Sequence, residues 1–144
     1  MSDRFFLDTN IFVYSFDRDA VKKADCATSL IRRAIETREG IVSYQVVQEF
    51  FSVALRRFEQ PMSLHDAEQY LTTIFAPLLA VHSSDGLYNQ ALHLAVEHSL
   101  SWYDALIVAS GLEGRCAILY SEDFQHGRRF SRLRVENPFV LGGS

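Results

Sequence analysis

Short apolar runs alternate with longer segments of helical periodicity along this chain of 144 residues. Short runs suit buried strands, whereas apolar residues spaced three and four apart suit helices. The expected strands are residues 5–7, 41–42, 78–81, 117–120 and 133–135. The expected helices are residues 11–16, 20–37, 44–58, 64–75, 85–98 and 101–112. Strands that alternate with helices favour a mostly parallel sheet with helices on both faces, which is an α/β fold.

The composition indicates one compact globular domain. Hydrophobic residues make up 48% of the chain and charged residues 22%, and the length suits one core. We find no internal repeat or linker, so we expect a single domain over residues 1–140 and a flexible tail over residues 141–144. The net charge of −4 means that any affinity for a polyanion must be local or assisted by metal ions.

The cysteines and the apolar runs indicate the compartment. Cys26 and Cys116 are far apart and lie in no zinc-binding spacing, so we expect buried thiols in a reducing compartment. The chain does not start with a basic region followed by a long apolar segment. No run approaches the roughly 18 apolar residues of a membrane span. A soluble cytoplasmic protein is therefore expected.

Four acidic residues, Asp8, Glu49, Asp104 and Asp123, suggest a catalytic site. All except Glu49 fall where expected strands give way to helices, and open α/β sheets bind their ligands at such positions. Asp8 has two interpretations. It could cap the following helix, or Asn10 could provide that cap and free Asp8 to point across the strand end.

The other three acids also have structural interpretations. Glu49 lies at the edge of the polar arc of its helix, where a solvated glutamate is typical. Ser101 and Asp104 resemble a capping box, whose helix dipole would also help to keep Asp104 ionised for a metal ion. Asp123 could be a simple turn residue, and the adjacent Glu122 leaves open which of the two acids points inward.

Four segments taken together resemble one known family. They are Leu7-Asp8-Thr9-Asn10, Val42-Ser43 leading into Val46-Val47-Gln48-Glu49, Tyr103-Asp104-Ala105-Leu106-Ile107, and Leu119-Tyr120-Ser121-Glu122-Asp123-Phe124. In this order and spacing they resemble the PIN-domain ribonucleases, particularly the toxins of the VapC type, over residues 4–136.

The resemblance implies a three-layer α/β/α fold with a central, mostly parallel sheet of about five strands. It implies that Asp8, Glu49, Asp104 and Asp123 form a catalytic, metal-binding quartet at the carboxyl ends of the strands. Asn10 and Ser121 match neighbouring positions that hold the acids or a water molecule beside the metal. The resemblance also implies an RNA substrate, a cognate antitoxin protein that inhibits the chain, and a homodimer.

The chemistry of four carboxylates fits this expectation. Their oxygens suit Mg²⁺ or Mn²⁺, whereas the absence of clustered His and Cys argues against zinc. Four carboxylates held close together would raise one another's pKa unless cations balanced them. We expect water activated by one or two ions to hydrolyse an RNA phosphodiester bond. Asp8 and Asp104 are the expected direct ligands, Asp123 completes a metal shell, and Glu49 binds directly or through water.

Two basic groups could contact RNA phosphates. Arg128, Arg129, Arg132 and Arg134 follow Asp123, and Arg56 and Arg57 extend the helix that carries Glu49. The alternative for each group is a solubilising surface patch. Trp102 and Tyr103 are predicted to be core aromatics, with stacking on an unpaired base as the alternative.

The sequence also allows other functions and one further surface. A phosphatase of the haloacid-dehalogenase type expects Asp-x-Asp after the first strand, but Asn10 occupies the third position here. A housekeeping PIN-type RNA-processing nuclease and a non-catalytic binding module for RNA or protein are the alternatives to a toxin. The helix with Glu49 carries an apolar stripe that could form a dimer surface or ordinary core: Val46, Val47, Phe50, Phe51, Ala54 and Phe58.

Overall fold

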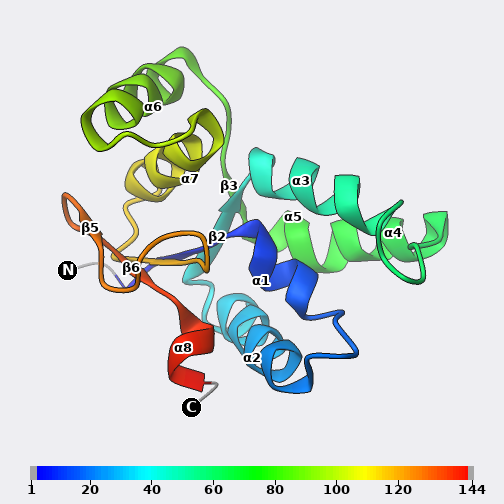
Figure 1. The fold of residues 1–144 in the computed structure, drawn as a ribbon. Helices are drawn as coiled ribbons and strands as arrows, with labels where there is room; N and C mark the ends of the chain where they lie inside the picture. Colours follow the sequence, from blue (N-terminus) through cyan, green and yellow to red (C-terminus); the bar gives the residue numbers. More distant parts are fainter. Residues whose placement is uncertain (1–2, 143–144) are drawn as a thin grey trace.

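The computed structural model describes residues 3–142 and places their strands in one six-stranded sheet (Figure 1). The strands are β1 Phe5–Leu7, β2 Gly40–Ser43, β3 Leu79–Val81, β4 Ile118–Tyr120, β5 Arg129–Phe130 and β6 Leu133–Glu136. Their order in the sheet is β3-β2-β1-β4-β6-β5. Every neighbouring pair is parallel except β5 and β6, which are antiparallel. The predicted α/β fold with a mostly parallel sheet is confirmed.

Helices cover both faces of this sheet. They are α1 Thr9–Tyr14, α2 Val21–Thr37, α3 Tyr44–Ala54, α4 Leu64–Tyr70, the π-helical turn η1 Leu71–Phe75, α5 Ala76–Leu78, α6 Asp85–His98, α7 Trp102–Glu113 and α8 Pro138–Gly142. Helix α7 packs on β2, β4 and β6, and α6 packs on α7. Figure 1 shows this pair on one side of the sheet and α1, α2 and α8 on the other. The three predicted layers are therefore present.

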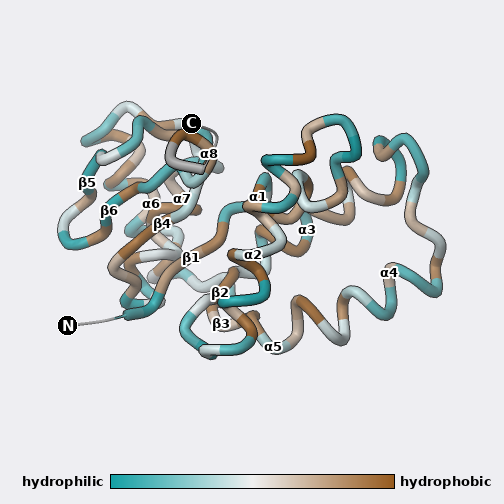
Figure 2. Tube along the Cα trace, turned by 90° about the horizontal axis from the view of Figure 1, so that it is seen from below, coloured by the Kyte–Doolittle hydropathy of each residue, from teal (hydrophilic) through white to brown (hydrophobic). Residues whose placement is uncertain are grey.

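Helices α3, α4 and α5 extend beyond the sheet as an arm, which is seen from below in Figure 2. Aromatic rings hold this arm together. Phe50 of α3 is fully buried, stacks on Tyr70 with ring centroids 5.0 Å apart, and meets Phe75 edge-on. The apolar stripe of α3 is therefore core, and not the free dimer surface that the sequence also allowed. Val46, Phe50 and Ala54 are buried, and Val47, Phe51 and Phe58 pack against the core.

Some element boundaries differ from the sequence-based expectations. Helix α1 begins two residues earlier than predicted because Asp8, and not a later residue, is its cap. The segment 64–75, predicted as one helix, changes from α4 to η1 at Leu71. The short β5 was not predicted, because two residues are too few to show a strand periodicity. Its strand conformation depends on pairing with β6.

The C-terminal end also differs from expectation. Helix α8 was not predicted, and it includes residues 141 and 142 of the proposed tail. Residues 143 and 144 lie outside the described residues. Within residues 3–142, no helix combines the length and the apolar character needed to cross a membrane.

Gly40 is the first residue of β2. Helix α2 ends at Thr37, and its C-cap residue Arg38 has a left-handed backbone with a φ of 61°. A Cβ at position 40 would collide with the backbone and side chain of Ala34. Glycine therefore lets α2 approach the first two strands closely.

Candidate active site

Asp8 follows β1 and is held from two directions. Its Oδ1 accepts a hydrogen bond of 2.7 Å from the Thr9 backbone N–H, which makes Asp8 the cap of α1. Its Oδ2 accepts a bond of 2.6 Å from the Ser121 hydroxyl, which comes from the end of the adjacent strand β4. Asp8 therefore fills both roles that the sequence offered as alternatives, because each role uses a different oxygen. Asn10 is not the cap.

Burial makes the Asp8 carboxyl unusually basic. The side chain is 3% exposed. Loss of solvent raises its pKa from 3.8 to about 7, against the opposing effect of the Ser121 hydrogen bond. The charges of Asp123 and Glu49 raise the pKa further. The first predicted acid thus lies within electrostatic reach of two others.

Asp123 follows β4 and lies beside Asp8. Its backbone N–H donates to the Ser121 Oγ at 3.0 Å, so one buried hydroxyl links the two acids. Burial and then the charge of Asp104 raise the pKa of Asp123, while hydrogen bonds with Asp8 and Asn10 oppose the rise. The Oδ1 of Asn10 is buried without a partner. Asn10 and Ser121 therefore both form hydrogen bonds with the acids.

Glu122 has partners of its own. Its Oε1 accepts a hydrogen bond of 2.6 Å from the Tyr14 hydroxyl, and its Oε2 pairs with the Lys23 ammonium at 3.0 Å. Although partial burial opposes the change, these two hydrogen bonds lower the pKa of Glu122. Glu122 thus ties the turn after β4 to α1 and α2. Asp123 is the acid that interacts with Asp8 and Asp104.

The remaining two acids lie at the start of α7 and within α3. The Asp104 backbone N–H donates to the Ser101 Oγ at 3.2 Å, so the predicted cap exists. Glu49 is half-buried and accepts a hydrogen bond of 2.8 Å from the Thr9 hydroxyl. Glu49 is therefore not the freely solvated residue that its helical position suggested. Thr9 is a residue whose role the sequence did not indicate, although it lies between Asp8 and Asn10.

The four acids form a series of neighbours. Asp8 interacts with Glu49 and Asp123, and Asp123 interacts with Asp104. Within residues 3–142, no three His, Cys, Asp or Glu side chains are arranged closely enough to hold a metal ion as they stand. The chemistry of the donors nevertheless fits a hard divalent cation, since all four are carboxylates. The unpaired Asn10 oxygen and the raised pKa of Asp8 also fit a cation that would supply the missing positive charge.

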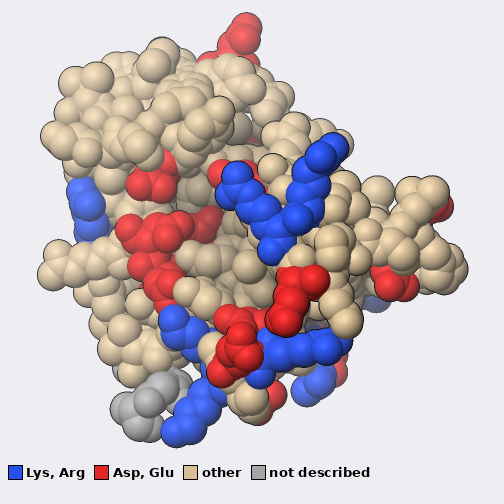
Figure 3. All heavy atoms as spheres, turned by 45° about the vertical axis from the view of Figure 1, so that its right-hand side comes forward, with Lys and Arg blue, Asp and Glu red and all other residues tan. Residues whose placement is uncertain are grey.

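Positive charge lies near the margins of an acidic hollow in the view of Figure 3. Arg56 is exposed in the turn after α3 and does not extend that helix. Arg129 is exposed on β5. Arg128 is partly used in packing, because its guanidinium lies 4.6 Å from the centre of the Phe130 ring and donates to the His98 carbonyl. Arg134 forms an ion pair with Glu136.

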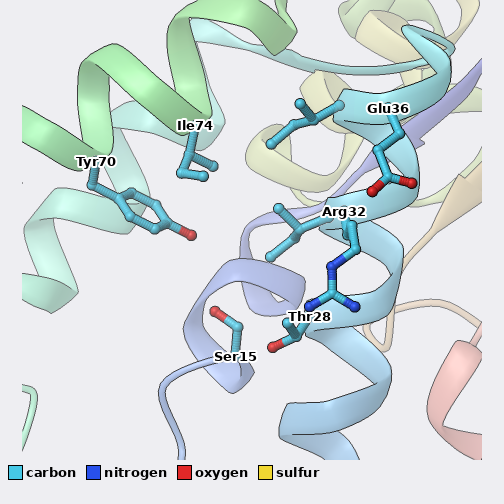
Figure 4. A pocket seen from close by; sticks show the side chains of 8 residues that line it. Ser15, Thr28, Arg32, Glu36, Tyr70 and Ile74 are labelled. Atoms are coloured by element: carbon cyan, nitrogen blue, oxygen red, sulfur yellow. The ribbon is translucent and has the colours of Figure 1, made fainter.

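Cavities lie at two separate places among the described residues. One, of about 410 Å³, lies between α2 and η1. Figure 4 shows Tyr70 and Ile74 facing Arg32 and Glu36 across it. None of the four acids lines this cavity. The other cavity lies at the start of α7, where Trp102 and Tyr103 are 37% and 63% exposed. The prediction that these two residues are core aromatics is therefore wrong.

A family model described as the PIN domain matches residues 5–134 of the chain. No curated protein sequence matches significantly. The fold, however, is shared with solved structures. A toxin-antitoxin complex from Klebsiella pneumoniae aligns with a TM-score of 0.65 at 18% identity, over 92% of this chain and 96% of the other.

Two further structures are similar. VapC20 of Mycobacterium tuberculosis, described as a toxin that cleaves the sarcin-ricin loop, has a TM-score of 0.59 at 19% identity and covers 90% of this chain and 98% of its own. FitAcB from Neisseria gonorrhoeae has a TM-score of 0.64 at 15% identity, with coverages of 94% and 98%. At these identities the likeness concerns the fold.

Proposed function

Because the chain belongs to the PIN-domain family, we propose that it is an endoribonuclease that depends on Mg²⁺ or Mn²⁺ and acts as the toxin of a toxin–antitoxin pair. The observation that carries the proposal is the series of neighbouring acids Glu49, Asp8, Asp123 and Asp104. Burial, together with the charges of Asp123 and Glu49, raises the pKa of Asp8 to about 7. Sites that use acid–base or metal chemistry commonly contain such perturbed groups.

Asp8, Asp104 and Asp123 would hold the ion, with Glu49 binding directly or through water. A bound divalent ion lowers the pKa of a water molecule and stabilises negative charge on the phosphate and the leaving oxygen. The protein's own contribution is positioning. Ser121 and the Thr9 backbone fix both oxygens of Asp8, and the Thr9 hydroxyl fixes Glu49.

Neighbouring groups complete the arrangement. Asn10 donates to Asp123 and presents an unpaired oxygen at the same place. The exposed Arg56 and Arg129 can contact phosphates of the RNA backbone. RNA bound by such contacts would be oriented with one phosphodiester bond against the acids.

The toxin role extends the proposal to partners. One similar structure is described as a toxin-antitoxin complex and another as a toxin. We propose that an antitoxin protein inhibits this chain and that the chain pairs with itself. Light scattering of the purified protein measures whether the chain pairs with itself. For the toxin role, we expect that induction of the chain arrests the growth of a bacterial host. The cognate antitoxin should reverse this arrest, and the Asp8→Asn variant should not cause it.

Cleavage of labelled total RNA tests the enzymatic proposal directly. The reaction is run with Mg²⁺, with Mn²⁺ and with a chelator, using the natural chain and the variants Asp8→Asn and Asp104→Asn. Asp66→Asn is the matched control for Asp104→Asn, because Asp66 also lies in a first helical turn and donates its N–H to a capping serine, at 3.1 Å. We expect metal-dependent cleavage that both site variants lose and the control keeps.

The opposite result has a clear meaning. If the folded chain cut no RNA with either ion, or if Asp8→Asn cut at the natural rate, the acidic group would not be a ribonuclease centre. A non-catalytic binding module would then be the better description. Cleavage without growth arrest would favour a housekeeping RNA-processing nuclease over a toxin.

A further inference from the structure

A cavity of about 260 Å³ lies where the start of α3, the end of β3 and the start of α7 meet. The Gln45 side-chain amide donates to the Tyr103 carbonyl at 3.1 Å and so joins α3 to α7 across one side of it. The cavity is many times larger than the roughly 30 Å³ that one water molecule occupies. It is smaller than the roughly 300–1,000 Å³ of most drug-sized sites. Its size therefore suits one small organic group.

Two polar atoms of this cavity's lining residues are buried without a hydrogen-bond partner. They are the Oγ of Ser43, a residue that is 3% exposed, and the Oε1 of Gln45. Ser43 stands at the N-cap position of α3, but its hydroxyl does not bond to the helix. Buried polar groups are nearly always paired, and each unpaired one has a cost. Both residues line the cavity, so its wall holds two hydrogen-bonding groups that the folded chain leaves unused.

Aromatic rings line the same cavity. Tyr44 lies edge-on to His82 with ring centroids 4.5 Å apart, and Tyr88 lies near Trp102 at 5.7 Å. Tyr44, Tyr88 and Trp102 all keep part of their surface exposed. No Lys, Arg, Asp or Glu lines the cavity. It is therefore suited to an uncharged, flat group with hydrogen-bonding edges, and not to a phosphate.

We propose that this cavity binds an unpaired nucleobase of the RNA beside the bond that is cut. The inference rests on the proposed ribonuclease function and adds a base-recognition site to it. Tyr103 directly precedes Asp104, and Gln45 lies one helical turn before Glu49. A base stacked on the aromatic rings, with its polar edge on Ser43 and Gln45, would position the adjoining backbone near both acids.

Fluorescence of Trp102 measures this binding without any cleavage, because it is the only tryptophan of the chain. The full-length protein is titrated in chelator with adenosine, guanosine, cytidine and uridine, and with a short single-stranded RNA and its abasic counterpart. We expect saturable quenching by at least one nucleoside and by the RNA, but much weaker quenching by the abasic strand.

Ser43→Ala tests the polar edge. Because the Ser43 hydroxyl has no partner, its removal should leave the melting temperature unchanged or higher while weakening base binding roughly three- to tenfold. Gln45→Leu should weaken it similarly. Ser15→Ala is the control, since Ser15 lines the other cavity and its hydroxyl already donates to the Phe12 carbonyl at 2.6 Å.

The outcomes separate this inference from the nuclease proposal. Quenching by bases in a chain that cuts no RNA would support the cavity and remove the ribonuclease. RNA cleavage without any base-dependent quenching, or with Ser43→Ala and Gln45→Leu binding bases as tightly as the natural chain, would overturn the cavity alone. Trp102 emission that depends on protein concentration and not on nucleosides would instead assign the surface to a second copy of the chain.

Discussion

The Ser121 hydroxyl donates a hydrogen bond of 2.6 Å to Oδ2 of Asp8, although the two residues are separated by 113 positions in the sequence. The Ser121 Oγ in turn accepts a hydrogen bond from the Asp123 backbone N–H. One fully buried hydroxyl therefore connects the carboxyl ends of β1 and β4 and orients the two acids that lie there.

Ser121→Ala should reduce RNA cleavage by roughly 10–100-fold, as is typical when a partner of a metal-binding side chain is lost. It should also raise the pKa of Asp8, because the Ser121 hydrogen bond lowers it. The measurements are cleavage rates against pH and thermal unfolding. Ser15→Ala is the control, since the Ser15 side chain is partly buried and its hydroxyl bonds to the nearby Phe12 carbonyl, away from the acids. Equal activity of the two variants would contradict the role given to Ser121.

Without metal, the stability of the protein should fall as the pH rises from about 4 to about 7. The reason is that the folded state keeps Asp8 protonated up to a pKa of about 7, whereas the unfolded chain releases that proton near 3.8. In this pH range the folded state binds more protons than the unfolded state, so raising the pH favours unfolding. Thermal melts in chelator across this range measure the effect, and Asp8→Asn should flatten it. Mg²⁺ should restore stability at pH 8 in the natural chain but much less in Asp8→Asn.

Asp123→Asn should lose far more activity than Glu122→Gln. Asp123 interacts with Asp8 and Asp104, whereas Glu122 is held by Tyr14 and Lys23. Glu122→Gln should instead lower the melting temperature, because it weakens the link between the turn and α2. Parallel measurement of single-turnover cleavage and thermal unfolding distinguishes the two. The assignment fails if Glu122→Gln is the inactive variant and Asp123→Asn is not.

Thr9→Val should lower cleavage by less than Glu49→Gln does. The valine removes the hydroxyl that fixes Glu49 but leaves the carboxylate in place and keeps the Thr9 backbone bond to Asp8. A higher Mg²⁺ concentration should therefore rescue Thr9→Val more readily than Glu49→Gln. Activity titrated against Mg²⁺ checks this, and a Thr9→Val variant that behaves like the natural chain would remove the positioning role.

Arg129→Ala should weaken RNA binding and reduce its salt dependence, whereas Arg128→Ala should chiefly reduce stability. Arg129 is exposed, so loss of one phosphate contact should lower the logarithmic salt slope by about 0.7. The Arg128 guanidinium lies over the Phe130 ring and donates to the His98 carbonyl. Together these two contacts stabilise the fold by about 1 kcal/mol. Binding to a short RNA at several salt concentrations, together with thermal melts, separates the two arginines.

Much of the secondary structure was predictable because apolar periodicity and helix capping depend on residues that are close together in the sequence. Strand β1 and helix α6 have the predicted bounds. Ser101 caps α7, as its position three residues before Asp104 suggested. The order of apolar runs also predicted the mostly parallel sheet. The four acids could be named because each follows or lies within a recognisable element.

The tertiary structure alone decided the partners of those acids. Nothing near Glu122 in the sequence indicates that Lys23 and Tyr14 hold it, and nothing near Glu49 indicates the hydroxyl of Thr9. Burial of Asp8, and with it the pKa of about 7, arises only when β1 lies between β2 and β4. Exposure of Trp102 and Tyr103 likewise depends on what packs beside the start of α7. Hydrogen bonding and desolvation depend on distance in space, and sequence position does not specify that distance before the chain folds.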